Sequence, residues 1–151
     1  MPPKPLLFLS PLHRATRQIG IHLGEALTGL DVQGTEAHLL SFLNSYAPVP
    51  VSEISRVFGT RKSTLTSILN RLEERGLTVR EPHPDDRRSL LVKITRRGRS
   101  VAKRVQRPVD ELERQVRSRI TAEELRGFQR VIEEIGNVTQ VSLRSQPKEK
   151  P

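Results

Sequence analysis

The sequence predicts a mainly α-helical protein that carries one small β-hairpin. Apolar residues recur every three or four positions along most of the 151 residues, which is the period of an amphipathic helix. Two short segments, 77–80 and 90–94, instead read as strands and bracket a turn-rich stretch of Pro and Asp. The apolar fraction is only 34%, with four Phe, one Tyr and no Trp, so the core is lean and we expect an oligomer.

Two helices are predicted in the N-terminal third. Ser10 is the expected N-cap of the first, with Pro11 at its first helical position, and its apolar spacing continues to about Gly29. The second helix opens at Gly34 and stops before the proline-containing segment 47–50.

Two shorter helices follow, joined by a tight turn. Ser52 is the expected N-cap of the first, Gly59 ends it, and Thr60 is the expected N-cap of the second, which runs toward Gly76. Two helices joined by a tight glycine-containing turn form a helix-turn-helix. With the hairpin after Gly76 as a wing, the expected fold is a winged helix-turn-helix.

A long helix and a last helix complete the chain. Thr95 begins the long helix, and Pro108 is expected to kink it because it removes one backbone hydrogen bond. Thr121 followed by Glu123 and Glu124 is a cap with acids in the first turn, and it opens the last amphipathic helix.

The basic excess of the chain is concentrated in one stretch. Net charge is +9, and nine of the 26 Lys and Arg residues lie between Arg87 and Arg107, where there is no acid. The other 17 basic residues equal the 17 acids. A solvated basic face is the alternative, but ordinary exposed faces mix both signs, so we favour a surface that binds a polyanion.

The polar side of the helix from Thr60 to Arg75 suits the major groove of DNA. Short polar side chains with a Lys near the helix N-terminus reach base edges without obstruction. An exposed polar face of an ordinary amphipathic helix is the alternative. The residues expected to contact bases are Arg61, Lys62, Ser63, Thr66, Ser67 and Asn70.

Further contacts are expected from the end of this helix and from the wing. Arg71 and Arg75 lie one turn apart, where phosphate contact and complementation of the helix dipole are equally reasonable. Arg87 and Arg88 follow Asp86 in the hairpin turn, so an Arg can enter a minor groove while the carboxylate orients its guanidinium. A solvated turn with local ion pairs is the alternative.

The segment Val51 to Gly76, followed by Asp86-x-Arg88-x-x-x-Val92-x-Ile94-Thr95, resembles the multiple antibiotic resistance regulator (MarR) family. The resemblance extends more weakly through the flanking helices and so covers nearly all of the chain. It implies a triangular homodimer with interlocking first and last helices, a recognition helix at 60–75 in the major groove, and Arg88 in the minor groove supported by Asp86.

Family members mostly repress transcription, and many release DNA when a small, often phenolic or anionic, ligand binds between the dimerisation and DNA-binding parts. The resemblance therefore implies an effector site that borders the first helix, with His13, Arg17 and His22 as its expected contacts. Ser67 stands where the family often has Arg, and Ser55 where it often has Ala, so the usual base contacts do not carry over to position 67.

Together these features predict dimerisation helices at 1–30 and 100–145, a winged helix-turn-helix DNA-binding domain at 31–99, and a disordered tail at 146–151. The expected function is a sequence-specific transcriptional regulator of double-stranded DNA, a repressor that acts as a homodimer on a pseudo-palindromic operator in the cytoplasm. The alternative is a nonspecific architectural DNA-binding protein or a protein-interaction winged helix.

No enzyme, metal, cofactor or membrane role is expected. The chain has no cysteine, and its four histidines lack metal-ligand spacing. Glycine-rich phosphate loops, nucleophile elbows and paired carboxylates are also absent from the sequence. The apolar run Leu6 to Leu9 is far shorter than a membrane span.

Overall fold

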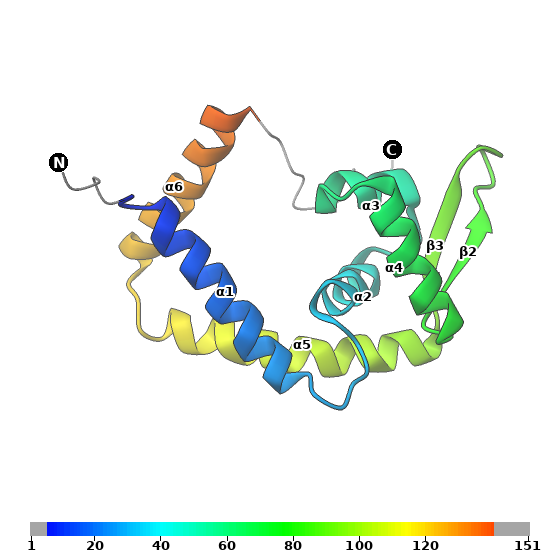
Figure 1. Ribbon diagram of the computed structural model, residues 1–151, viewed down its shortest axis with the longest axis horizontal. Helices are drawn as coiled ribbons and strands as arrows, with labels where there is room; N and C mark the ends of the chain where they lie inside the picture. The colour runs from blue at the N-terminus through cyan, green and yellow to red at the C-terminus, as the bar shows by residue number, and fades with distance from the viewer. Residues whose placement is uncertain (1–5, 141–151) are drawn as a thin grey trace.

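The computed structural model describes residues 6–140 and confirms the mainly helical fold with a small antiparallel sheet (Figure 1). The predicted tail at 146–151, and residues 1–5 and 141–145 of the predicted dimerisation segments, lie outside the described residues. The elements are α1 (Leu9–Ala26), α2 (Gly34–Tyr46), β1 (Val49–Pro50), α3 (Val51–Phe58), α4 (Lys62–Glu74), β2 (Thr78–Pro82), β3 (Leu90–Ile94), α5 (Arg96–Arg117) and α6 (Ala122–Thr139).

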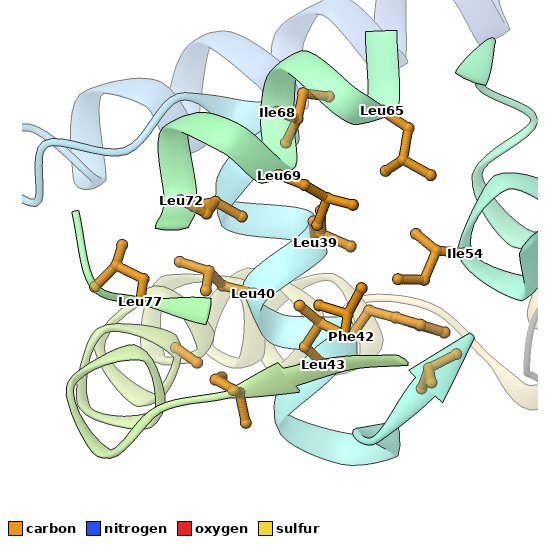
Figure 2. Packing of buried hydrophobic residues seen from close by; sticks show 14 residues of the cluster. Leu39, Leu40, Phe42, Leu43, Ile54, Leu65, Ile68, Leu69, Leu72 and Leu77 are labelled. Carbon is orange, nitrogen blue, oxygen red and sulfur yellow. The ribbon is translucent and has the colours of Figure 1, made fainter. Parts of the chain in front are cut away.

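Helix α2 lies at the centre of the hydrophobic core (Figure 2). Its Leu39, Leu40 and Leu43 are fully buried and pack with the apolar side of α4, the sheet and the start of α5. Leu69 and Leu72 on α4 are also fully buried, so the opposite side of α4 is left to face solvent. The predicted inward side of this helix is confirmed.

The sheet has the strand order β1-β3-β2, with both pairs antiparallel. The hairpin is longer than predicted on its first strand, which runs from Thr78 to Pro82, and its second strand ends at Ile94 as predicted. Strand β1 was not predicted, because two residues ending in Pro50 are too short to show an alternating pattern.

Three predicted helix caps are wrong. Helix α1 begins at Leu9 with Phe8 in the N-cap position, and Ser10 lies inside it. Helix α3 begins at Val51, so Ser52 lies in its first turn. Helix α4 has Arg61 rather than Thr60 as its N-cap. The residues at these three N-caps form no capping hydrogen bond with their side chains. A prediction that relies on capping side chains therefore misplaces the helix starts by one or two residues.

The caps of the last two helices are confirmed. Thr95 Oγ1 accepts a hydrogen bond from the Gly98 amide at 2.9 Å. At Thr121 the hydroxyl accepts from the Glu124 amide, and the Glu124 carboxylate accepts from the Thr121 amide at 2.7 Å. Helix α5 continues through Pro108 as a single helix.

Helices α1 and α6 stand apart from the core (Figure 1), and neither contains a buried residue. Large apolar side chains are exposed on both, including Ile19 and Ile21 on α1 and Phe128, Val131 and Ile132 on α6. Within residues 6–140 no helix has the length and apolar character needed to span a membrane.

Candidate nucleic-acid interface

All six residues predicted to contact bases are exposed on the outer side of α4 or at its N-cap. Two of them use their hydroxyl protons inside the helix. Thr66 Oγ1 donates to the Lys62 carbonyl at 2.8 Å, and Ser67 Oγ donates to the Ser63 carbonyl at 3.1 Å. The oxygens of Thr66 and Ser67 therefore have only acceptor capacity free for a ligand, which suits amino groups of adenine or cytosine.

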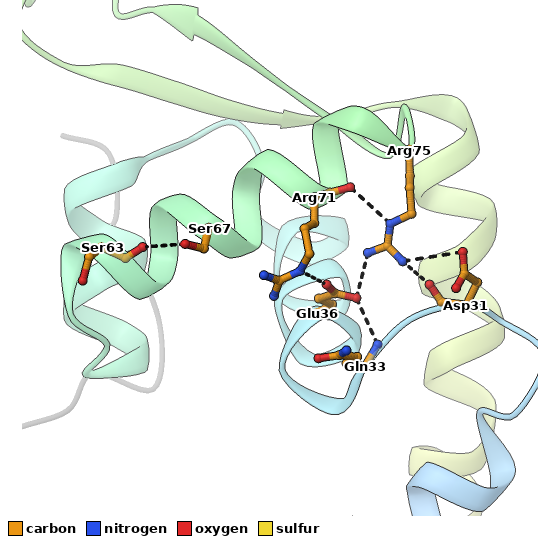
Figure 3. Close-up of polar contacts among 7 residues, drawn as sticks. All are labelled: Asp31, Gln33, Glu36, Ser63, Ser67, Arg71 and Arg75. Carbon is orange, nitrogen blue, oxygen red and sulfur yellow. Dashed lines mark hydrogen bonds and ion pairs between the residues drawn. The ribbon is translucent and has the colours of Figure 1, made fainter.

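A buried carboxylate lies behind the C-terminal half of α4 (Figure 3). Glu36 is only 2% exposed, and its Oε1 accepts from Arg71 Nε while its Oε2 accepts from Arg75 Nη2, each at 2.7 Å. The Gln33 backbone amide also donates to this carboxylate, at 3.0 Å. Burial raises the pKa of Glu36, but the bonds from Arg71, Gln33 and Arg75 outweigh it and leave the pKa below its ordinary value.

Arg71 and Arg75 thus form ion pairs with a buried carboxylate. The sequence analysis considered only phosphate contact and complementation of the helix dipole for these two residues. Arg75 is 24% exposed and also contacts the Asp31 carbonyl, so its guanidinium ties α4 to the segment before α2. Arg71 is 46% exposed, and Figure 3 shows its terminal nitrogens pointing away from Glu36, where they remain available to a phosphate. Glu36 was missed as a partner, although its place three residues after an N-cap marks a capping box.

A second tie joins α4 to the wing through Arg80 on β2, which the sequence analysis also missed. Its Nε and Nη2 both donate to Glu73 Oε2, at 3.1 and 2.6 Å. The same Nη2 donates to Asn70 Oδ1 at 2.6 Å. Asn70, predicted to contact bases, therefore already has one polar atom bound within the protein.

The wing tip differs from the prediction in one respect. Asp86 Oδ1 accepts from the backbone amide of Arg88 at 3.0 Å, and its carbonyl accepts from the Ser89 amide at 2.9 Å. The carboxylate therefore shapes the turn, and the prediction that it orients the Arg88 guanidinium is wrong for this structure. Among residues 6–140, Arg87 and Arg88 form no ion pair, and both are exposed.

A hollow of about 290 Å³ lies between the start of α3, α4 and the wing. Its lining includes Lys62 from α4, Arg80 from β2 and Arg88 from the turn between β2 and β3, and no acid lines it. Cationic side chains around a hollow without carboxylates attract a polyanion. The described part of the chain thus gathers exposed polar side chains and cationic side chains on one surface.

Comparison with known proteins identifies this arrangement. The sequence model of the MarR family matches residues 30–89, from the loop after α1 to the turn of the wing. The HTH-type transcriptional repressor Rv2887 of Mycobacterium tuberculosis is 29% identical over 126 residues, which cover 83% of this chain and 91% of that protein. The multiple antibiotic resistance protein MarR of Salmonella typhimurium is 28% identical over 114 residues, 75% of this chain and 79% of that protein.

The chain is therefore similar in sequence to MarR-family proteins, most clearly over residues 30–89. Solved MarR-type structures share its fold. The S. aureus MepR–DNA complex superposes with a TM-score of 0.81 at 16% identity, over 89% of this chain and 99% of that one. A mutant MarR from E. coli complexed with operator DNA gives a TM-score of 0.72 at 25% identity, over 86% and 94% of the two chains.

The chain has a further hollow of about 750 Å³ where α1 meets α2 and α3. Thr16, Gly20 and Leu23 line it from α1, and most of the remaining lining is apolar. The predicted effector contacts His13, Arg17 and His22 are exposed and do not line it. That an effector binds beside α1 stays a prediction, and the residues of α1 that face the hollow can be assigned only from the packing of α1 on α2.

Proposed function

We propose that this chain is a member of the MarR family, a sequence-specific double-stranded DNA-binding transcriptional regulator that acts as a repressor in the cytoplasm. The observation that carries the proposal is the shared surface of α4 and the wing, where exposed polar side chains lie beside the cationic hollow of Lys62, Arg80 and Arg88. Relatives named as repressors, and the operator complex of the E. coli protein, support it. This is a binding function without a catalytic step.

The dimerisation segments are proposed at 1–30 and 100–145 and the DNA-binding domain at 31–99. Apolar side chains exposed on α1 and α6 support this division, because contiguous exposed apolar surface marks an interface. A two-fold dimer presents two copies of α4, so the proposed target is a pseudo-palindromic operator.

A small aromatic effector is proposed to bind in the hollow between α1, α2 and α3. Its mainly apolar lining, with His38 and Phe58 among the residues, suits a ring better than a compact anion. By favouring a different separation of the two recognition helices, such a ligand would lower DNA affinity. Calorimetry with salicylate tests this: absence of both binding and any loss of DNA affinity would count against it.

The experiment that tests the DNA-binding proposal is a salt series on one selected operator and on random DNA. Arg88→Ala is expected to weaken operator binding by about 1–3 kcal/mol, the scale of one good groove contact, with the dimer intact. Lys103→Ala, farther along the basic stretch, should weaken both DNAs alike and lower the salt slope by about 1. If the Arg88 variant binds operator as tightly as the parent, the wing does not contact DNA.

The same series separates the regulator from the alternative of a nonspecific architectural protein. A regulator must prefer its operator over random DNA by about a thousand-fold or more. Equal affinity for the two DNAs, with a steep salt slope on both, would favour the architectural function. No affinity for either DNA would favour a protein-interaction domain.

A further inference from the structure

Arg80 donates a hydrogen bond to the side-chain carbonyl of Asn70, which lies on the exposed side of α4 that is proposed to face DNA. Strand β2 and α4 lie side by side (Figure 1), and Arg80 Nη2 donates to Asn70 Oδ1 at 2.6 Å. The backbone of Arg80 is fixed by its pairing with Val92, and its guanidinium is fixed by Glu73. Arg80 and Glu73 are only 23% and 26% exposed, so water competes weakly for their contact.

The chemistry of arginine settles which way the Asn70 amide faces. A guanidinium has only donors, so the atom it contacts must be the amide oxygen. The Asn70 NH2 group is then the free hydrogen-bonding group of an exposed side chain. Asn70 therefore offers DNA two donors and a carbonyl that is already bound by a cation.

This arrangement opposes the contact that asparagine usually makes in a major groove. Asparagine normally binds adenine with two bonds, accepting from the N6 amino group and donating to N7. At Asn70 the N6 amino group of adenine would have to share the amide oxygen with the Arg80 guanidinium. The amino group, itself a donor, would then lie next to a positive charge. Guanine offers two acceptors, N7 and O6, and suits a side chain that only donates.

We propose that Arg80 is a specificity-determining residue, which holds the Asn70 carbonyl so that Asn70 reads guanine rather than adenine in the operator. The inference rests on the proposed DNA-binding function and adds a base preference to it. Arg80 acts here as a positioning residue through Asn70, whatever contact it makes with the DNA itself.

The test is selection of bound fragments from a randomised double-stranded library by the full-length chain, followed by sequencing. The parent should enrich guanine at one position of each half-site, and Asn70→Ala should lose the preference at that position alone. Arg80→Met keeps the aliphatic stem and frees the carbonyl, so the ratio of adenine to guanine there should rise about ten-fold, since one bidentate base contact discriminates on that scale.

Two further variants separate positioning from a general structural effect. Glu73→Gln removes the charge partner of Arg80 but leaves the bond to Asn70, so guanine should stay preferred. Asn70→Asp leaves Arg80 in place and replaces the outward donor by an acceptor, so the preference should move to cytosine or adenine, whose amino groups donate.

Unchanged guanine preference in both Arg80→Met and Asn70→Asp would overturn the inference while leaving the proposed function standing. Adenine enriched at that position by the parent would also overturn it. A parent that enriches no motif from the library would instead refute the sequence-specific function itself. Circular dichroism of each variant identifies any that fails to fold, and Asn70→Asp, an exposed change, then decides the question.

Discussion

Replacing Glu36 by Gln should destabilise the protein, because it removes the negative charge between two arginines. Breaking a buried ion pair by removing one partner costs about 3–5 kcal/mol. Arg71 and Arg75 are 46% and 24% exposed, so water can solvate the released guanidiniums, and the amide keeps one acceptor oxygen. We therefore expect a loss of about 2 kcal/mol, or about 4–8 °C in Tm for a chain of this size.

Urea unfolding at one fixed protein concentration measures this, with Glu111→Gln as the matched control. Glu111 bonds Arg114 on the exposed side of α5, and its loss should change stability little. An unfolding midpoint for Glu36→Gln equal to that of the parent would refute the argument that this carboxylate supports α4.

The stability difference between the parent and Glu36→Gln should change with pH in one direction. The pKa of Glu36 is lower in the folded protein than its ordinary value of 4.5. The carboxylate therefore contributes its full stabilisation above that ordinary value and loses it as the pH falls through the lower folded pKa. The stability difference between parent and Glu36→Gln should be constant near neutral pH and shrink under acid conditions. A difference that grows as the pH falls would contradict the assignment.

Three other changes test the packing. Thr78 is 1% exposed, and its hydroxyl has no hydrogen-bond partner among residues 6–140, so Thr78→Val should stabilise by about 1 kcal/mol in urea unfolding, while exposed Thr64→Val should not. A Cβ on Gly98 would lie 2.0 Å from the Leu77 carbonyl oxygen, so Gly98→Ala should cost at least about 3 kcal/mol; a normal midpoint would contradict this close approach. Ile132→Asp on the exposed side of α6 should give a monomer in sedimentation, and a dimer unchanged at micromolar concentration would remove α6 from the proposed interface.

The sequence predicted the exposed side of α4 because that side follows from local periodicity. Leu65, Ile68, Leu69 and Leu72 repeat at helical spacing, and the residues between them must point outward. The hairpin was predictable for the same reason, since two strands around a turn of Pro and Asp form a local signal. The three missed caps show that helix ends are less well specified than helix faces.

The contacts of α4 with Glu36 and with Arg80 could not be predicted from periodicity. Glu36 lies 35 residues from Arg71 and 39 from Arg75 along the chain, and only the packing of α2 against α4 brings them together. Arg80 and Asn70 are closer in sequence, yet they occupy a strand and a helix whose relative placement depends on the turn at Gly76. Periodicity indicates which side of an element is buried, but it does not indicate which polar side chains meet across two elements.

The contacts of Glu36 and Arg80 with α4 affect how a change at α1 or α6 can reach α4 and the wing. Glu36 fixes α4 to α2, Arg80 fixes α4 to the wing strand, and the buried leucines of α4 lie in the main core. Helix α4 and the wing are therefore held as one body, whereas α1 and α6 contain no buried residue. A ligand between α1 and α2, or a shift at the proposed dimer contact, should then move the whole reading surface without rearranging it. In the proposed dimer, control of DNA binding would act through the distance between the two copies of α4, and the proposed base preference at Asn70 would stay the same.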